Sequence, residues 1–307
     1  MAATPTIVTE SAGAPIRRSR RPGARKAALL GMAFVLPFVV VFLLFRAGPA
    51  AGGIVLSFLS QNLAGDFTWI GTANYDALFA DPIFWNALRV TLIYSVIAVP
   101  LVVVVSVAMA TMAARSVRGI KVYRAAFFLP VITSLVTTGV IWTWIYSTDG
   151  PLNWFLGLFG APAIPWISSS ALVLPSLAVV AVWSRFGYDM LILMAGILDI
   201  PKDYYEAAEL DGAGPWRRFV NITLPGLKRP LFFVLVLEIV ASFQVFDLIY
   251  VMTGGGPVNA SYSLVFMIYD QGFKYGHFGY ASAAGVVLFA ITVVITIIQR
   301  LFFREDD

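Results

Sequence analysis

The stretch Glu206-Ala207-Ala208-Glu209-Leu210-Asp211-Gly212, followed after nine residues by Ile222-Thr223-Leu224-Pro225, separates two long apolar segments of a 307-residue chain. Its pattern predicts a short helix, a glycine stop and a second short helix. Pro201 suits the first turn of a helix, because its missing N–H is not needed there. Gly212 can take the left-handed conformation that ends a helix. We therefore expect residues 199–229 to form a compact polar loop between membrane spans.

Small side chains share one face of the first short helix. Tyr204, Ala207 and Ala208 fall at positions i, i+3 and i+4. Two alanines leave a shallow surface that another backbone or groove can approach closely, and Glu206 at its edge is available to a cationic partner. An ordinary loop with a helical turn has a similar composition, so composition alone leaves both interpretations open.

The composition places the chain in a membrane. Hydrophobic residues make up 59% of it and charged residues 12%, against about 25% charged in soluble domains. With no cysteine and one histidine, thiolate and histidine metal clusters are excluded. The sequence contains no Gly-x4-Gly-Lys-Ser/Thr phosphate loop, so we do not expect this chain to hydrolyse ATP itself. An enzyme is therefore not favoured, and no cofactor is expected in this chain.

Six segments are long enough to cross a bilayer, for which a helix needs about 20 mostly apolar residues. These predicted spans are Ala27–Phe45, Ala87–Ala113, Val122–Tyr146, Leu172–Leu198, Leu231–Met252 and Tyr280–Phe303. Prolines inside them predict kinks, which neighbouring helices tolerate in a membrane. These are Pro37, Pro100, Pro130 and Pro175. The sequence thus predicts an all-α membrane protein with six transmembrane helices in one domain, residues 27–307.

The residues before the first span form a basic tail, 1–26, rich in Arg, Ser, Pro and Ala, which we expect to be disordered. A cleaved signal peptide is the alternative for Arg17–Phe45. Its apolar part of about 19 residues exceeds the usual 7–15 of a signal peptide. The length favours a retained span.

Positive charges set the direction of the spans. The positive-inside rule places Lys and Arg on the cytoplasmic side, and 17 of the 21 basic residues fall on one side of the predicted spans. That side holds both termini and the polar loop 199–229. We therefore expect a multi-pass membrane protein with both termini in the cytoplasm. The longest outer connection, between the first two spans, is expected to contain short surface helices.

Polar groups inside the fourth span mark either a solute pathway or a structural ion pair. Arg185 and Asp189 lie four residues apart and therefore on one face. Ser184 and Tyr188 extend that polar arc. A mutual Arg185–Asp189 ion pair is the alternative to a pathway wall.

The fifth span carries two polar sides. Glu238 and Ser242 share one face, whereas Gln244 and Asp247 lie on another. Glu238 is nearer the cytoplasmic end and suits a structural pair, while Gln244 and Asp247 lie in the outer half. The candidate pathway residues are Ser184, Arg185, Tyr188, Asp189, Ser242, Gln244 and Asp247.

The polar loop resembles the EAA signature of permease subunits of bacterial ABC importers. The pattern Glu206-Ala207-Ala208-x3-Gly212-x9-Ile222-x-Leu224-Pro225 agrees in both spacings and in its place before the second-to-last span. Other stretches resemble the carbohydrate branch of that family, the maltose and glycerol-phosphate permeases. They are Ile70-Gly71-x2-Asn74-Tyr75, Tyr123–Pro130, Phe246-Asp247, Thr253–Pro257 and Phe278–Ala283.

This resemblance implies the transmembrane domain of a type I ABC importer, in which the loop is a coupling helix that docks in a cleft of a separate ATPase. Carried over by position, docking falls to Glu206, Ala207, Ala208, Asp211, Gly212 and Ala213. The implied partners are a second permease subunit, two copies of an ATPase that binds ATP and Mg, an extracytoplasmic solute-binding protein and membrane lipid, with no nucleic acid. The implied cargo is a sugar or related polyol compound, moved by alternating access.

Two other classes are weighed against the importer. An ion- or proton-coupled carrier would use intramembrane charges as relay groups, and a structural scaffold would carry no solute. A carrier does not need an ATPase-docking loop, so the polar loop favours the importer. Disaccharides, oligosaccharides and glycerol-phosphate compounds all fit the sequence.

Overall fold

A computed structural model describes residues 24–61, 66–115 and 118–304 of the chain. Most of the predicted tail 1–26 lies outside this range. The chain divides into two compact units, Met1–Gly52 and Gly53–Asp307. Each unit is described by itself.

The described residues of the first unit are helical. Helix α1 (Ala24–Phe42) leads through a π-helix (Leu43–Ala47) into α2 (Gly48–Leu56). The helical run is longer than the predicted span Ala27–Phe45, because Pro49 falls in the first turn of α2, where its missing N–H is not needed. Its apolar side chains are exposed, so bilayer lipid or another chain can cover them.

A β-hairpin and a short helix open the second unit. Strands β1 (Leu59–Gln61) and β2 (Phe67–Trp69) pair antiparallel, and α3 (Ala73–Ala80) follows. The Nδ2 of Asn74 donates to the carbonyls of Ser57 and Leu59 at 2.8 and 2.9 Å, which fastens the hairpin to α3. A short helix in this connection was predicted and is confirmed; the hairpin was not predicted.

The rest of the second unit is a helical bundle with short helices at both ends. Its elements are α4 (Pro82–Ala113), α5 (Ile120–Phe128), a 3₁₀ helix (Leu129–Ile132), α6 (Leu135–Ile145), α7 (Pro151–Gly157), α8 (Val173–Asp199), α9 (Lys202–Leu210), α10 (Pro215–Arg218), a π-helix (Phe219–Thr223), α11 (Leu224–Gly226), α12 (Lys228–Phe243), α13 (Asp247–Met252), α14 (Leu264–Tyr269), a second π-helix (Asp270–Lys274) and α15 (Phe278–Arg304).

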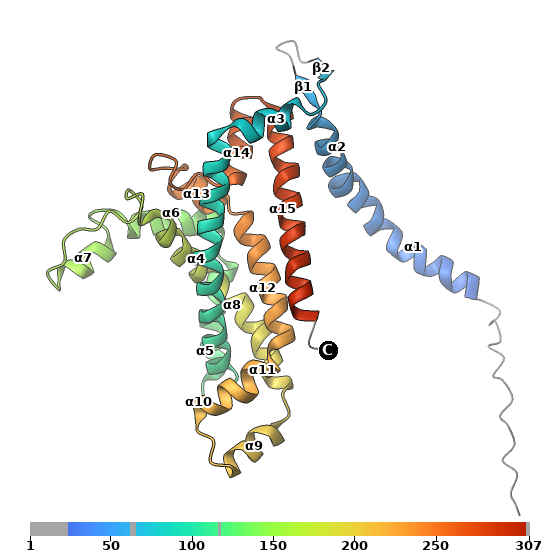
Figure 1. The fold of residues 1–307 in the computed structure, drawn as a ribbon. Coiled ribbons are helices and arrows are strands. Elements are labelled where there is room, and N and C mark those ends of the chain that lie inside the picture. The colour runs from blue at the N-terminus through green and yellow to red at the C-terminus, as the bar shows by residue number, and fades with distance from the viewer. Residues whose placement is uncertain (1–23, 62–65, 116–117, 305–307) are drawn as a thin grey trace, which may run out of the picture. The chain divides into compact units, whose positions relative to one another are not determined.

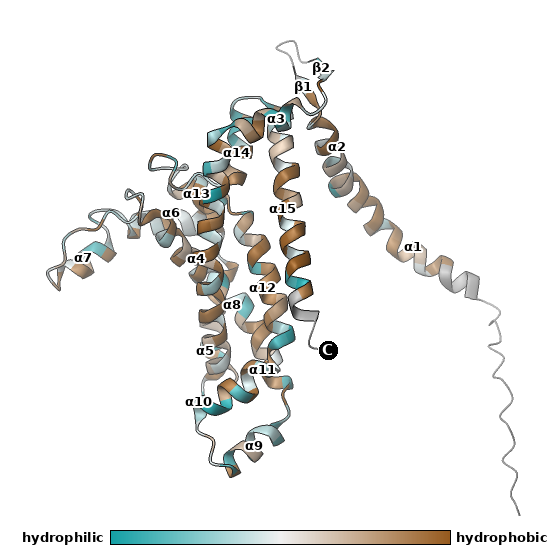
Figure 2. Ribbon diagram, in the orientation of Figure 1, coloured by the Kyte–Doolittle hydropathy of each residue, from teal (hydrophilic) through white to brown (hydrophobic). Residues whose placement is uncertain are grey.

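Helices α4, α8, α12 and α15 form the bundle, with α9 to α11 at its lower end (Figure 1). Figure 2 shows hydrophobic residues along the bundle and more hydrophilic ones in α9 and α10. Small residues line the contact between α4 and α8: Ala87 and Ala110 from α4 and Ala178 from α8 are fully buried. Such residues let two helices approach closely in a membrane.

Four helices of the described chain are long and apolar enough to cross a membrane. They are Leu29–Leu56, Pro82–Ala113, Val173–Asp199 and Phe278–Leu301. The pair Ile120–Ile132 and Leu135–Ile145 bends by 96° and makes a fifth if it counts as one broken span. The kink predicted at Pro130 falls at this break, because proline lacks the N–H that would continue the helix.

The predicted fifth span, Leu231–Met252, is broken in two. Helix α12 ends at Phe243 and α13 begins at Asp247. The hydroxyl of Ser263 donates to the carbonyl of Val245 at 3.0 Å and so satisfies a backbone group that the break leaves free. The all-α membrane fold is therefore confirmed, while the count of six spans stays a prediction.

Candidate functional site

The polar loop, residues 199–229, has the predicted helix–stop–helix form. Helix α9 ends in a Schellman motif, with Gly212 left-handed at φ +74°. The N–H of Ala213 donates to the carbonyl of Ala208 at 2.8 Å, and the N–H of Gly212 donates to Glu209 at 3.0 Å. These two bonds are the pattern that satisfies the last carbonyls of a helix.

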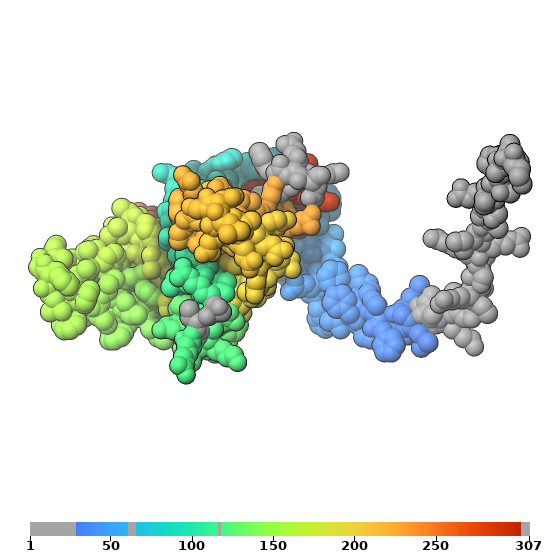
Figure 3. Space-filling view, turned by 90° about the horizontal axis from the view of Figure 1, so that it is seen from below, coloured from blue at the N-terminus to red at the C-terminus, as the bar shows by residue number. Residues whose placement is uncertain are grey.

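Two side-chain contacts hold the second half of the loop to α9. The Arg218 guanidinium donates to the carboxylate of Glu209 at 2.9 Å. The hydroxyls of Tyr205 and Thr223 lie 3.0 Å apart. The loop is thus a defined element at the end of the bundle, and Figure 3 shows residues of this region (yellow to orange) on the surface seen from below.

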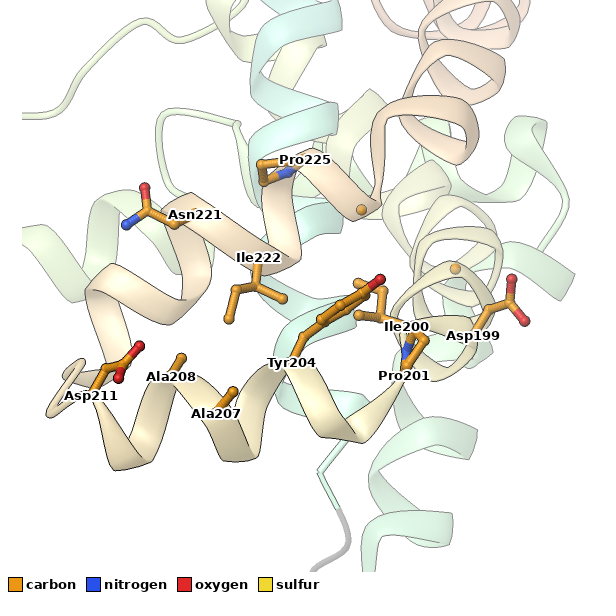
Figure 4. Close-up of a pocket in the computed structure, with 12 residues that line it drawn as sticks. Asp199, Ile200, Pro201, Tyr204, Ala207, Ala208, Asp211, Asn221, Ile222 and Pro225 are labelled. Carbon is orange, nitrogen blue, oxygen red and sulfur yellow. The ribbon is translucent and has the colours of Figure 1, made fainter. Parts of the chain in front are cut away.

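A hollow of about 640 Å³ lies between the two halves of the loop. Tyr204, Ala207 and Ala208 line one side, with Ile222 and Pro225 on the opposite side (Figure 4). The small-residue face predicted from the sequence therefore looks across the hollow toward the chain's own returning segment. A partner that reaches this face must place a side chain or a helix edge in the hollow.

The outer side of the loop carries exposed apolar residues that the sequence reasoning missed. Leu210 is 89% exposed and Trp216 is 74% exposed. Large apolar side chains held in water by a polar loop are typical of an interaction surface. The signal in the sequence was an apolar residue next to charges near the glycine stop, since Leu210 lies between Glu209 and Asp211 and Trp216 precedes Arg217.

Acidic side chains lie in the second half of α9 and directly after it. Glu209 is paired with Arg218, whereas Glu206 and Asp211 are exposed and form no ion pair within the described part of the chain. Figure 4 shows Asp211 at the rim of the hollow. This arrangement leaves Glu206 open to a cationic partner, as the sequence suggested.

Inside the bundle, a charged pair joins α8 to α12. The Nη2 and Nε of Arg185 donate to the two carboxylate oxygens of Glu238 at 2.7–2.9 Å. The Arg185 side chain is 36% exposed and that of Glu238 only 4%. The partner of Arg185 is therefore Glu238 on a different helix. Asp189 is fully buried, and neither of its carboxylate oxygens has a hydrogen-bond partner among the described atoms.

A cavity of about 220 Å³ brings four of the seven candidate pathway residues together where α8 faces the break between α12 and α13. These are Ser184, Arg185, Gln244 and Asp247. The structure places the other three candidates elsewhere. Ser242 is buried and donates to Ser95 of α4 at 2.9 Å, Tyr188 is half-exposed, and Asp189 is buried outside the cavity lining.

The stretches that resemble carbohydrate permeases make structural contacts. The Arg124 guanidinium donates to the carbonyl of Ala113 and so caps the end of α4. The Tyr280 hydroxyl donates to the carboxylate of Asp81 at 2.6 Å and fastens α15 to the start of α4. In the Thr253–Pro257 loop the Ser261 hydroxyl donates to the Gly256 carbonyl at 2.6 Å.

One titratable group of that outer loop is perturbed. The Tyr262 hydroxyl donates to the carboxylate of Asp270 at 3.1 Å. Burial, and secondarily the nearby carboxylate, raise the pKa of Tyr262 above its ordinary value. The tyrosine therefore stays neutral and keeps donating to Asp270.

Comparison with known proteins places the chain in a family. Residues 82–305 match the model of the family described as "Binding-protein-dependent transport system inner membrane component". The chain belongs to this family. It is therefore a transport permease, which is not a catalytic enzyme, and an inner-membrane component of an ABC transporter.

Relatives agree over nearly the full length. A probable ABC transporter permease of Bacillus subtilis is 35% identical and covers 89% of this chain and 90% of its own length. The trehalose/maltose transport system permease of Thermococcus litoralis is 30% identical, and the alignment covers 92% of this chain and 96% of that permease. A solved bacterial ABC transporter that imports the acidic polysaccharide alginate shares the fold, with a TM-score of 0.78, 23% identity and coverage of 92% and 97%. Family and fold support an ATP-driven importer over the ion-coupled carrier.

Proposed function

We propose that this permease moves a sugar or related polyol compound, and that Ser184, Arg185, Gln244 and Asp247 line its pathway. One observation carries the proposal: the polar loop joins two of the helices that line this cavity, α8 and α12. It follows α8 directly and leads directly into α12. A force applied to the loop therefore reaches both walls of the cavity.

Two contacts make α8 and α12 move together. At the base, Gly196 lies so close to Pro230 that a Cβ would stand 2.6 Å from the proline ring. Farther along, the Arg185–Glu238 pair joins the same two helices. A push on α9 is thus transmitted as motion of a connected pair, which suits the rocking of alternating access.

The proposed partners follow from this arrangement. An ATPase that binds ATP and Mg grips Glu206, Ala207, Ala208, Asp211, Gly212 and Ala213. Two copies of that ATPase, a second permease subunit and an extracytoplasmic solute-binding protein complete the importer. Support comes from the exposed acidic and apolar residues of the loop and from the family, whose described role depends on a binding protein. Both termini lie in the cytoplasm in this proposal, on the side of the loop.

Reconstitution tests the proposed function. The complete importer, with its binding protein, is placed in proteoliposomes that contain ATP, and uptake of labelled maltose, trehalose and glycerol 3-phosphate is measured. We expect ATP-dependent uptake of at least one of them and stimulation of ATP hydrolysis by the same solute. Uptake that does not require ATP would contradict the proposal.

Single cysteines test the orientation, since the natural chain has none. Val258 in the outer loop is 95% exposed and Leu210 in the polar loop is 89% exposed. A membrane-impermeant maleimide should label Val258→Cys and Leu210→Cys from opposite sides. Labelling from the same side would contradict the proposed orientation.

A further inference from the structure

The net charge of the cavity between α8 and the α12–α13 break depends on whether the guanidinium of Arg185 is paired. Arg185 is the only basic side chain among the described residues that line it. Three donor–acceptor contacts of 2.7–2.9 Å tie that guanidinium to Glu238. A bidentate pair of this kind is strong and fixed in geometry. The positive charge of Arg185 is therefore already neutralised by the protein.

The other polar groups of the cavity wall are neutral or acidic. Asp247 and Gln244 are exposed, and their side chains make no hydrogen bond or ion pair within the described chain. The neutral hydroxyl groups of Tyr94 and Ser184 complete the polar lining. An exposed carboxylate accepts hydrogen bonds and donates none, and an amide does both. This wall thus matches a solute that offers many hydroxyl groups.

We propose that this subunit's wall of the pathway favours uncharged polyhydroxylated solutes and disfavours solutes that carry a carboxylate, phosphate or sulfonate. The inference rests on the proposed function, because it concerns the cavity assigned there to the pathway. A neutral sugar donates its hydroxyl groups to the free carboxylate of Asp247. An anion meets repulsion from Asp247 and finds no free cation.

An anion also has a poor alternative at Arg185. To bind the guanidinium it would have to displace Glu238, whose side chain is 4% exposed. The displaced carboxylate would then be buried in the same bundle as Asp189, which already lacks a hydrogen-bond partner. Burying an unpaired charge is strongly unfavourable. The pair therefore protects the pathway from anions as well as joining two helices.

The fold itself does not decide this property. The solved transporter that imports acidic alginate has the same fold as this chain, and the trehalose/maltose permease is a relative at 30% identity. Selection by charge must therefore lie in individual side chains. In this chain those side chains are Asp247 and the Arg185–Glu238 pair.

The test is equilibrium binding to the complete importer in detergent, without its binding protein, so that only the membrane pathway discriminates. The probes are labelled maltose and the matched uronic acid, in which the terminal hydroxymethyl group of maltose is oxidised to a carboxylate. We expect maltose to bind at least about tenfold more tightly than the uronic acid, which corresponds to a difference of about 1.4 kcal/mol in binding free energy. Equal or tighter binding of the uronic acid would overturn the inference.

Two variants locate the effect. Asp247→Asn should bring the two affinities to within about threefold of each other, a gain of roughly 0.7 kcal/mol for the acid. Glu238→Gln should free Arg185 and favour the acid. The control is Asp149→Asn, which removes an exposed carboxylate outside the cavity and should leave the ratio unchanged. Asp247 is exposed, so Asp247→Asn should fold and decides the test even if Glu238→Gln does not fold. An unchanged ratio of the maltose and uronic acid affinities in Asp247→Asn overturns the assignment of charge selection to this residue.

The outcomes separate the two proposals. If neither probe nor trehalose binds and no uptake is seen, the carbohydrate assignment fails. If both probes bind equally, the carbohydrate assignment stands and only the charge selection is contradicted.

Discussion

The polar loop connects the ends of α8 and α12, whereas the Arg185–Glu238 pair joins the same two helices within the bundle, and the two regions are built in opposite ways. The loop exposes its key side chains and is held by a Schellman motif, one surface ion pair and one hydroxyl contact. The pair is largely buried and makes three charged hydrogen bonds. A surface that a partner binds can therefore vary with little loss of stability, whereas an internal link between helices cannot.

The largest expected effect is on the internal link. Glu238→Ala leaves the Arg185 guanidinium, whose side chain is 36% exposed, without its partner, and losing hydrogen bonds to a charged group typically removes about 1.5–3 kcal/mol of stability. Thermal unfolding of the purified complex should show a clear drop in Tm. The exposed Glu206→Ala is the matched control and should fall within about 0.5 kcal/mol of the natural chain.

A double variant sharpens this prediction. Arg185→Met combined with Glu238→Leu removes both charges, and replacing a buried pair by apolar residues is often neutral in stability. Recovery of the Tm without recovery of solute-stimulated ATP hydrolysis would show that the pair has a role beyond packing. A single Glu238→Ala variant as stable as the control would remove the distinction between the two regions.

The next effect is on coupling through the loop. A Cβ at Gly212 would meet no atom within 4 Å, so a large side chain there points into open space where a partner would dock. Gly212→Trp should lower the rate of uptake at least about tenfold, which corresponds to about 1.4 kcal/mol of free energy. The amount of permease inserted in the membrane should stay the same. Gly212→Asn is the control, because asparagine tolerates the left-handed conformation. Normal uptake in the tryptophan variant would contradict the docking assignment.

A third change separates the two helices at their base. Gly196→Ala forces Pro230 and Leu227 to move, because a Cβ would lie 2.6 and 3.0 Å from their side chains. Overpacking of this kind typically removes about 1–3 kcal/mol of stability. Solute-stimulated ATP hydrolysis should fall as well. Gly285→Ala, where a Cβ meets nothing within 4 Å, should leave solute-stimulated ATP hydrolysis unchanged and should not lower stability, since alanine favours a helix interior.

The smallest effect concerns the surface ion pair of the loop. Arg218→Ala removes the 2.9 Å contact with Glu209, and such exposed pairs contribute about 0.2–1 kcal/mol. A double-mutant cycle with Glu209→Ala measures the coupling energy in unfolding experiments. A value above about 2 kcal/mol would mean that the loop is held as firmly as the buried pair.

The sequence predicted the loop well because its determinants are local. A proline at the start, a glycine at the end and small residues at helical spacing act within a few residues of one another. Gly212 was expected to end the helix, and it does so with φ +74°. The orientation of the alanine face toward the hollow could not be predicted, since it depends on where residues 221–226 return.

The bundle interior was predicted only in part. Polarity placed Arg185, Gln244 and Asp247 on candidate faces, but helical spacing gives the direction of a side chain and not its partner. The sequence therefore offered Asp189, four residues away, as a partner of Arg185, while its partner in the structure is Glu238, 53 residues away in the sequence. The break after Phe243 was missed for a similar reason, because it depends on the Ser263 hydroxyl supplied by a later segment.

The close contact of Gly196 with Pro230 sets a length scale for the transport movement. Eleven residues separate Gly196 from Arg185 on α8, which corresponds to about 16 Å of helix at 1.5 Å per residue. If the joined pair of helices tilts by about 10° about its base, the level of Arg185 moves by about 3 Å over that arm. A small rotation at the polar loop would therefore be amplified to a movement of about 3 Å at the level of the cavity.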